Sequence, residues 1–343
     1  MGYKHADAYR SHDDVELVAC ADRNRERAVA FAREYEFGVG DVYESHGALL
    51  AAVEPDVLSV TVQPASHERI VRDAIDAGVE AIHCEKPMAR TVGGSRGMAE
   101  RAANRGVQLT FNHQRRYGRP FRTAKRLLDD GEVGALERVE FGAANLYDYG
   151  SHSFDLCNYY NDETAADWVL AGLDYHERDV RYGVHNENQA IVQWEYANGV
   201  DGFAATGAGR SLVGCHNRLV GTDGVIEIGP EADPGVDLRV RRDGAGWEPV
   251  ETGEEGLHDP MNEYVRRAVV DAVDSLDAGR SCELHAGNAL NATELIFGAW
   301  ESVRRNGRVT FPLDVDDNPL ESMVEAGELT PASTSEPDAG GTE

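Results

Sequence analysis

The first third of the chain alternates between short apolar runs and longer stretches in which apolar side chains recur every three or four positions. Apolar runs bounded by turn residues predict buried strands, and the longer spacing predicts helices. The expected strands are 16–22, 56–62, 79–84 and 107–111, and the expected helices are 25–35, 45–53, 66–77 and 91–104. Strands alternating with helices of this length predict an α/β domain with a doubly wound parallel sheet.

Beyond about residue 115 the pattern changes to successive strands with few helices between them. Helices are expected at 121–129, 151–160, 260–276 and 285–306, and strands at 137–143, 167–173, 188–196, 200–206, 217–220, 225–228 and 237–241. The dipeptides Asn198-Gly199 and Asp223-Gly224 are typical of two-residue hairpin turns. Strands joined in this way predict a largely antiparallel sheet, so the second domain is expected to be α+β.

These patterns divide the chain into three expected segments. Residues 1–115 form the parallel-sheet domain, 116–313 form the α+β domain, and 314–343 form a disordered tail that is acidic and rich in Ser, Thr, Pro and Gly. Alternation in the strand 188–196 directs Ala190, Val192 and Trp194 to one side of the second sheet. The other face is expected to be open and partly apolar, which is typical of a subunit contact.

The charge balance narrows the choice of partners. The chain has 33 basic and 61 acidic residues, a formal net charge of −28. Such a field repels nucleic acid and anionic membranes, so neither is an expected partner. Acids spread along the whole chain favour a halophilic protein, and an ordinary acidic cytosolic protein is the alternative.

Cysteine usage gives no sign of a metal or disulfide framework. Five cysteines lie far apart, and no pair has the spacing of a zinc or redox motif. They are expected to be reduced, structural thiols in a cytoplasmic protein.

The segment Glu85-Lys86-Pro87 is the strongest candidate for chemistry. It follows the expected strand 79–84, and ligands of open α/β sheets bind beyond the carboxyl ends of their strands. Pro87 holds Lys86 in extended geometry. The ammonium group of Lys86 is therefore expected in a binding site, and a solvated loop is the alternative.

The start of the chain resembles the later part of a dinucleotide-binding unit. Gly2 fits the third glycine of a Gly-x-Gly-x-x-Gly turn, and Asp22 follows it by twenty residues, where an acid accepts hydrogen bonds from the adenine-side ribose. The first strand and two glycines are then expected to be absent from this sequence, leaving a gap in the sheet and weak NAD binding. Asp22 favours NAD, whereas Arg23 and Arg25 keep NADP as an alternative.

A second candidate set lies at the start of the helix 151–160. Asp148 and His152 are four residues apart and share one face of a helix. His152 is suited to act as a base near neutral pH, and Asp148 can orient it or stabilise its positive charge. A capping pair or a buried polar pair is the alternative.

Together these motifs resemble the Gfo/Idh/MocA family of oxidoreductases over residues 1–313. The resemblance rests on four motifs: Glu85-Lys86-Pro87, Pro64-x-x-His67, Asn112-His113-Gln114-Arg115-Arg116 and Asp148-x-Gly150-x-His152-x-x-Asp155. It implies an N-terminal Rossmann domain that binds NAD(P), and hydride transfer between nicotinamide and a secondary alcohol of a sugar, polyol or related compound. It also implies that Lys86, Asp148 and His152 are catalytic and that the chain forms a homodimer or homotetramer through the second sheet.

The remaining motif residues have less specific roles. Gly2, Asp22, Arg23, Pro64, His67, Glu85 and Lys86 are the candidate cofactor-binding residues, and Asn112 and Arg116 are the candidate substrate-binding residues. A satisfied loop or a helix start is the alternative for Asn112, Arg116 and His67, and Asp155 is expected to be structural. The loop that usually covers the substrate in this family is absent between 141 and 148, so the site is expected to be open.

Two other function classes fit the same motifs. Some members of this family are NAD-dependent glycosidases that oxidise and re-reduce a sugar, and a cofactor-binding regulator without chemistry is the third class. Any hydride transfer excludes the regulator, and turnover of an aryl glycoside distinguishes the glycosidase.

Overall fold

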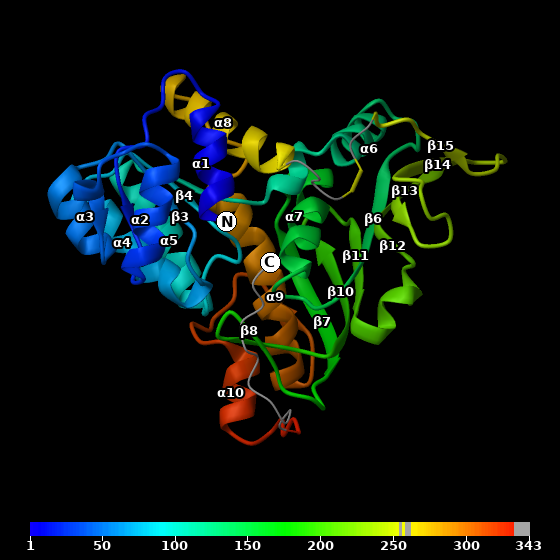
Figure 1. Ribbon diagram of the computed structural model, residues 1–343. Coiled ribbons are helices and arrows are strands. Elements are labelled where there is room, and N and C mark those ends of the chain that lie inside the picture. Colours follow the sequence, from blue (N-terminus) through cyan, green and yellow to red (C-terminus); the bar gives the residue numbers. More distant parts are fainter. Residues whose placement is uncertain (254–255, 258–261, 333–343) are drawn as a thin grey trace. The chain divides into compact units, whose positions relative to one another are not determined.

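The computed structural model describes residues 1–253, 256–257 and 262–332 and consists of two compact units (Figure 1). The first unit contains Met1–Asp130 and Val250–Thr293, and the second contains Gly131–Pro249 and Glu294–Glu343. The sequence patterns predict a boundary at residue 115 and assign 116–130 and 250–293 to the second domain. In the structure these two segments belong to the first unit. Helix α8 (Glu263–Asp277) explains part of this difference, because its Val265, Val269 and Val273 pack on Ala8 and Tyr9 in the first unit.

The first unit contains the expected alternation of strands and helices. Its parallel strands are β1 (Cys20–Ala21), β2 (Val42–Tyr43), β3 (Val57–Val60), β4 (Ala81–Cys84) and β5 (Gln108–Phe111). Its helices before α8 are α1 (Gly2–Arg10), α2 (Arg25–Glu34), α3 (His46–Val53), α4 (His67–Ala77), α5 (Val92–Arg105) and α6 (Arg119–Asp129). The expected α/β architecture of this part of the chain is confirmed.

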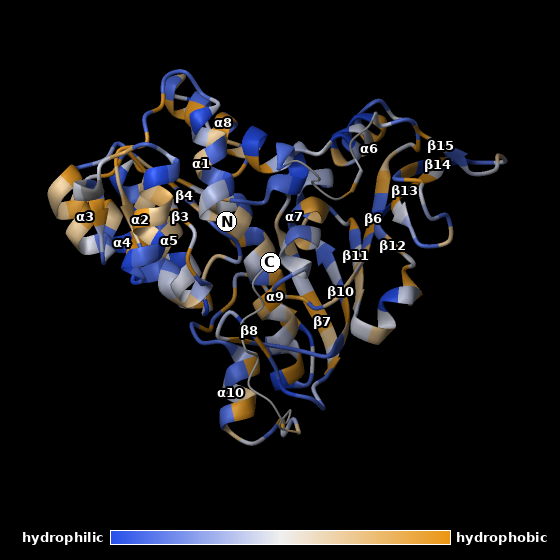
Figure 2. Ribbon diagram, in the orientation of Figure 1, coloured by the Kyte–Doolittle hydropathy of each residue, from blue (hydrophilic) through white to orange (hydrophobic). Residues whose placement is uncertain are grey.

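Local sequence signals explain where these helices begin and end. The Thr91 side chain accepts a hydrogen bond from Gly94 N–H at the start of α5, and Gly106 ends that helix in the left-handed conformation with φ of 68°. Every residue of β4 is buried, as expected for a central parallel strand. Figure 2 shows hydrophobic colours along α3, which contributes Leu49 and Leu50 to the core beside the sheet.

The parallel strands form two separate sheets. The orders are β1–β2 and β3–β4–β5, and within the described residues no strand pairs with both β1 and β3. The expected gap in this sheet is therefore present. One edge each of β1 and β3 consequently lacks a neighbouring strand in the described part of the chain.

The second unit is built on a nine-stranded sheet with the order β15-β14-β13-β12-β6-β11-β10-β7-β16. These strands are β6 (Leu136–Ala143), β7 (Ala166–Asp174), β10 (Gln189–Tyr196), β11 (Asp201–Thr206), β12 (Cys215–Gly221), β13 (Gly224–Pro230), β14 (Leu238–Arg242), β15 (Glu248–Pro249) and β16 (Val309–Thr310). All neighbouring pairs are antiparallel except β6 and β11. The expected largely antiparallel sheet is confirmed.

One face of this sheet holds the core of the second unit. Ala190, Val192 and Trp194 lie on one side of the sheet, as expected, and are buried there, whereas Ile191 on the opposite face is 42 % exposed. Helix α7 (Gly150–Tyr160) packs on the buried face, with the Phe154 ring 5.2 Å from that of Trp194. Gly202 faces Trp194 across the strands, and a Cβ there would lie 1.9 Å from the indole, so only glycine leaves room for it.

Two features of the second unit depart from the sequence patterns. The expectation of a disordered tail over 314–343 is wrong for its described part, because α10 (Pro319–Glu325) is a helix with Leu320 and Met323 buried. Asn318 caps this helix by accepting a hydrogen bond from Glu321 N–H. Residues 333–343 lie outside the described residues, as does Pro260 at the expected start of the helix that α8 represents.

The second departure is a hairpin that the patterns did not indicate. Strands β8 (Asp179–Arg181) and β9 (Val184–Asn186) pair through Tyr182 and Gly183, both with positive φ. Such a turn usually carries Asn-Gly, so Tyr-Gly gave no signal.

No helix among the described residues is long and apolar enough to span a membrane. All five cysteines are free thiols, and all except Cys20 are buried.

Candidate active site

Lys86 follows directly on the buried strand β4. Glu85 N–H donates to Val60 O at 2.9 Å, which carries the pairing with β3 one residue beyond the end of β4. Lys86 is partly exposed there, whereas Glu85 and Pro87 on either side are buried. The sequence therefore places Lys86 at the carboxyl edge of the parallel sheet.

Glu85 is held by two side chains from other parts of the first unit. His5 on α1 lies with Nε2 at 2.9 Å from Glu85 Oε1, and Asn112 after β5 donates to the same oxygen at 2.8 Å. The other ring nitrogen of His5 lies 2.7 Å from Ser59 Oγ on β3. This network joins α1 to the ends of three strands directly beside Lys86.

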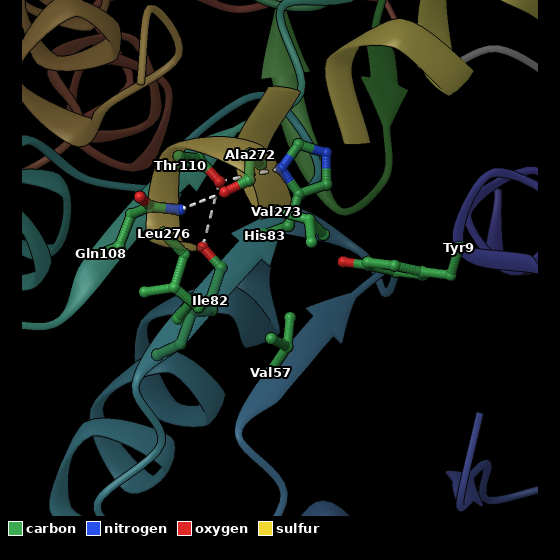
Figure 3. A pocket seen from close by; sticks show the side chains of 10 residues that line it. Tyr9, Val57, Ile82, His83, Gln108, Thr110, Ala272, Val273 and Leu276 are labelled. Atoms are coloured by element: carbon green, nitrogen blue, oxygen red, sulfur yellow. Dashed lines mark hydrogen bonds between the residues drawn. The ribbon is translucent and has the colours of Figure 1, made fainter. Parts of the chain in front are cut away.

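The network continues along β4 into the sheet. His83 Nδ1 lies 2.8 Å from Thr110 Oγ1, and Thr110 Oγ1 donates to Ile82 O at 3.2 Å (Figure 3). Tyr9 directs its hydroxyl towards the same strands, beside a cavity of about 10 Å³, which is one water molecule in size. Burial, together with the charge of His5, lowers the pKa of His83 to about 3, so His83 is neutral at physiological pH.

The electrostatics of Glu85 have opposing causes. Burial alone raises the pKa of this carboxyl, but the hydrogen bond and charge of His5, the Asn112 amide and the charge of Lys86 outweigh it. The result is a pKa of about 2, so Glu85 is ionised under all physiological conditions. Glu85 is a candidate cofactor residue by sequence, but its carboxylate is turned into the protein and accepts hydrogen bonds there.

His67 also has its side chain turned inward. It is fully buried, with Nε2 at 2.9 Å from Val62 O and Nδ1 at 3.1 Å from both Pro87 O and Met88 O. Burial lowers the pKa of His67, and the hydrogen bonds to the Val62, Met88 and Pro87 carbonyls oppose this effect. His67 joins the turn that begins at Pro64 to the segment after Lys86, which fixes both at the same edge of the sheet.

The adenine-side candidates lie near the start of α1 and the end of β1. Asp22 accepts a hydrogen bond from Asn24 N–H at 2.8 Å, and its side chain is 36 % exposed. Arg23 is exposed beside it. A Cβ on Gly2 would lie 3.4 Å from Thr61 Oγ1, so α1 begins in close contact with the chain after β3.

The two substrate candidates of the first unit are both buried. Asn112 is 0 % exposed and Arg116 is 1 % exposed. Asn112 binds Glu85, and Arg116 donates through Nη1 to Glu283 O at 3.4 Å. Their observed contacts are therefore within the first unit.

The second unit positions Asp148 and His152 at the start of α7, with exposed fractions of 7 % and 5 %. Asn145 Oδ1 accepts hydrogen bonds from Asp148 N–H at 2.9 Å and Tyr149 N–H at 3.0 Å. A Cβ on Gly150 would lie 2.7 Å from Asn145 O, so this tight approach requires glycine. Asp155, one turn further on, is 2 % exposed.

Arg181 is a neighbour of Asp148 that the sequence did not indicate. Its Nη1 lies 3.8 Å from Asp148 Oδ2, and its Nε donates to both carboxylate oxygens of Asp179 at 3.2 Å. Arg181 belongs to the hairpin β8–β9, whose unusual turn also escaped sequence analysis. The hairpin thereby brings a guanidinium group next to the candidate catalytic residue Asp148.

The candidate catalytic residues are divided between the two units. Lys86 belongs to the first unit, and Asp148 and His152 belong to the second. Their convergence on one cleft stays a prediction. Among the described residues no group of three or more His, Cys, Asp or Glu side chains is arranged to hold a metal ion.

Residues 1–113 match the profile of an oxidoreductase family with an NAD-binding Rossmann fold, the Gfo/Idh/MocA family. The expected resemblance is confirmed, and so is the fold over most of the chain. An oxidoreductase from Agrobacterium radiobacter, solved in complex with NAD+, L-tartaric acid and magnesium, aligns over 90 % of this chain and 95 % of its own with a TM-score of 0.74 at 17 % identity.

Similar proteins by sequence include sugar and polyol dehydrogenases. D-apiose dehydrogenase of Paraburkholderia graminis is 33 % identical over 142 residues, which cover 41 % of this chain and 37 % of that protein. Inositol 2-dehydrogenase of Pseudomonas savastanoi pv. phaseolicola is 36 % identical over 122 residues, which cover 35 % of each. The chain thus spans little more than a third of the length of these curated relatives.

Proposed function

We propose that this protein is an NAD-dependent dehydrogenase that transfers hydride between nicotinamide and a secondary alcohol of a sugar, polyol or related compound. The observation that carries the proposal is Lys86, held at the carboxyl end of β4 by the buried Glu85 network, in a segment that belongs to a family of NAD-binding oxidoreductases. The names of the sequence relatives support the substrate class.

The side chains of the first unit fit the cofactor. Asp22 is partly exposed at the end of β1 and keeps acceptor capacity for the hydroxyl groups of a ribose. Its negative charge opposes a 2′-phosphate, which favours NAD, and the exposed Arg23 leaves NADP as the alternative. Lys86, which follows β4, would lie beside the nicotinamide end of the cofactor. When bound, the cofactor accepts the hydride that leaves the substrate carbon.

The chain's own residues would transfer the hydroxyl proton of the substrate. His152 would accept the hydroxyl proton of the substrate, because a neutral imidazole is a base suited to neutral pH. Asp148, one helical turn before it, would orient the ring or stabilise the imidazolium. Lys86 would donate to the substrate oxygen and so favour loss of its proton. This division of roles requires the two units to bring the three side chains together.

The test is a screen of sugars, polyols and aldonic acids with NAD, followed by NADH absorbance in molar salt. We expect Lys86→Ala and His152→Gln to lower kcat by about 10²–10⁴-fold, the usual contribution of general acid–base catalysis. Lys4→Ala and His176→Gln are matched controls at exposed positions and are expected to retain activity. NADH formation excludes a regulator without chemistry, and release of the aglycone from an aryl glycoside without net NADH would replace the dehydrogenase by a glycosidase.

The open face of the nine-stranded sheet supports association of two copies. Leu170 and Ile191 are 43 % and 42 % exposed on this face. Beyond them a ladder of opposite charges crosses four strands: Glu140–Arg218 at 2.6 Å, Arg218–Glu227 at 2.8 Å and Glu227–Arg239 at 2.5 Å. An apolar region continued by ordered, paired charges is suited to a second copy of itself.

We infer a homodimer or homotetramer through this face, in the cytoplasm of a cell with high internal salt. Light scattering in molar salt tests the assembly, with Ile191→Lys expected to shift the mass to that of one chain. A wild-type mass of one chain would contradict the inference. The net charge of −28 supports the halophilic habit, which a fall in unfolding temperature upon removal of salt would test.

A further inference from the structure

Glu187 is a buried carboxylate that none of the sequence motifs includes. It lies between β9 and β10 and is 1 % exposed. Its Oε1 accepts hydrogen bonds from Leu146 N–H at 2.7 Å and from the Thr206 hydroxyl at 3.1 Å. Its Oε2 accepts one from the Trp300 indole N–H at 3.2 Å. Three uncharged donors from three separate elements of the second unit thus converge on one carboxylate.

These contacts hold the segment that carries Asp148. Leu146 lies two residues before Asp148, and Asn145 on its other side accepts the backbone N–H groups of Asp148 and Tyr149. Tyr147 stacks on Trp300, with ring centroids 6.0 Å apart and planes inclined by 28°. The backbone, the neighbouring ring and the start of α7 are therefore all tied to the Glu187 contacts.

We propose that Glu187 is a positioning residue that fixes the segment 144–149, and with it Asp148 and the start of α7, in the geometry needed for proton transfer. This rests on the proposed function, because it assigns Asp148 and His152 to catalysis. An ionised carboxylate accepts at both oxygens and satisfies all three donors. A protonated Glu187 carries a hydroxyl in place of one acceptor oxygen, so one of the three donors loses a good acceptor, and we expect the segment to be held less firmly.

The pKa of Glu187 lies near neutral pH. Burial raises its pKa to about 7, because the hydrogen bonds from Leu146, Trp300 and Thr206 only partly offset the cost of desolvation. Two ionisable neighbours have to be distinguished from Glu187. Burial and, to a smaller extent, the charge of Glu187 raise the pKa of Tyr175. His185 on β9 lies with its Nδ1 2.6 Å from the Tyr175 hydroxyl. Activity alone cannot isolate Glu187, because the proposed reaction also depends on the side chains of His152 and Asp148.

The first experiment follows the indole N–H resonance of Trp300 in ¹⁵N-labelled wild-type protein from pH 5 to 9. The chain has only four tryptophans, and Trp300→Phe assigns the signal. We expect one titration step near neutral pH that persists in His185→Gln and disappears in Glu187→Gln. A signal that does not move with pH, or whose step is lost with His185, would overturn the proposal, and this holds whether or not a substrate is known.

The second experiment measures kinetics with the best substrate of the NAD screen. Glu187→Gln leaves an amide N–H₂ facing the Trp300 N–H, and we expect kcat to fall by roughly 10–100-fold with little change in KM, as for a small misplacement of catalytic groups. Trp300→Phe removes the opposing donor and keeps the ring on Tyr147, so the double variant is expected to recover most of this loss. Glu177→Gln, at an exposed position, is the matched control.

The two proposals fail in different ways. Unchanged kcat in Glu187→Gln, or a double variant worse than the single one, contradicts the positioning role. Absence of hydride transfer in the wild type contradicts the proposed function, while the indole titration still decides whether Glu187 holds the segment.

Discussion

Two of the buried glutamates, one in each unit, have similar exposure but opposite electrostatics. Glu85 in the first unit and Glu187 in the second are 7 % and 1 % exposed. Burial raises the pKa of both, yet the pKa of Glu85 is about 2 and that of Glu187 is about 7. Burial alone therefore does not determine the state of either carboxyl group.

The difference lies in the charge of their partners. Glu85 accepts from His5 and Asn112 and lies next to the ammonium of Lys86, so positive charge compensates its desolvation. Glu187 has only neutral donors, whose hydrogen bonds stabilise the carboxylate less than burial destabilises it. The first is a permanent anion beside Lys86, whereas the second is a group that neutral pH can switch.

The largest expected effect is the loss of the Glu85 carboxylate. Glu85→Ala leaves His5 and Asn112 buried without their shared acceptor, and breaking a buried pair in this way costs about 3–5 kcal/mol. Urea unfolding at pH 7 measures the loss against Glu80→Ala, an exposed position where about 0.5 kcal/mol or less is expected. A loss equal to that of the control would show that the network contributes nothing.

The second prediction concerns stability and pH, where the two glutamates have opposite signs. The folded pKa of Glu85 lies below the ordinary value of 4.5, so its contribution is present above pH 4.5 and is lost as the pH falls towards 2. The folded pKa of Glu187 lies above 4.5, so stability falls as the pH rises from 4.5 through 7. One pKa unit corresponds to about 1.4 kcal/mol, so each effect is on the order of 3 kcal/mol.

Unfolding free energies of the wild type and Glu187→Gln from pH 4.5 to 8 measure this second effect. The wild type is expected to lose stability relative to the variant as the pH rises, because the variant carries no buried charge at position 187. A constant difference between the two proteins across this range would contradict the raised pKa of Glu187.

A smaller effect is expected from His5→Gln. Glutamine retains a donor to Glu85 but lacks the imidazole whose interactions lower the pKa of that carboxyl, and hydrogen bonds to charged groups contribute about 1.5–3 kcal/mol. The folded pKa of Glu85 then rises towards 4.5, so the destabilisation is present at neutral pH and shrinks as the pH falls towards 2. His46→Gln, whose partner Asp73 is 43 % exposed, is the control and is expected to show little pH dependence. Equal pH dependence in both variants would remove His5 as the cause.

The sequence predicted the parts of this molecule that depend on local patterns. Glu85-Lys86-Pro87 was found because an apolar strand ends there, and the Ala190–Trp194 alternation identified side chains that share one face of the second sheet. Both are properties of neighbouring residues. The helical spacing of Asp148 and His152 was likewise visible, and α7 begins within one residue of the expected helix.

The partners that decide the electrostatics could not be predicted in this way. His5 and Asn112 reach Glu85 across 80 and 27 residues of sequence, and Trp300 reaches Glu187 across 113. No short pattern records such contacts, because they arise only when the sheet and helices have formed. Helix α10 was missed for a related reason, since its few apolar residues, Leu320 and Met323 among them, are embedded in an acidic, Pro-containing segment.

The smallest expected effect concerns Arg181. Its partner Asp148 is a third carboxylate, and unlike Glu85 and Glu187 it is paired with a partly exposed guanidinium group. Asp148 lies 3.8 Å from the Arg181 guanidinium, but that side chain is 41 % exposed and is shared with Asp179. A partly exposed pair of this kind contributes about 0–1 kcal/mol, so Arg181→Ala is expected to change kcat/KM by roughly fivefold or less. Raising salt from low to molar concentration screens such a pair, so the difference from wild type is expected to shrink. Arg178→Ala, exposed in the same segment, controls for the loss of a positive charge. A loss that is large and independent of salt would instead place Arg181 in direct contact with the substrate.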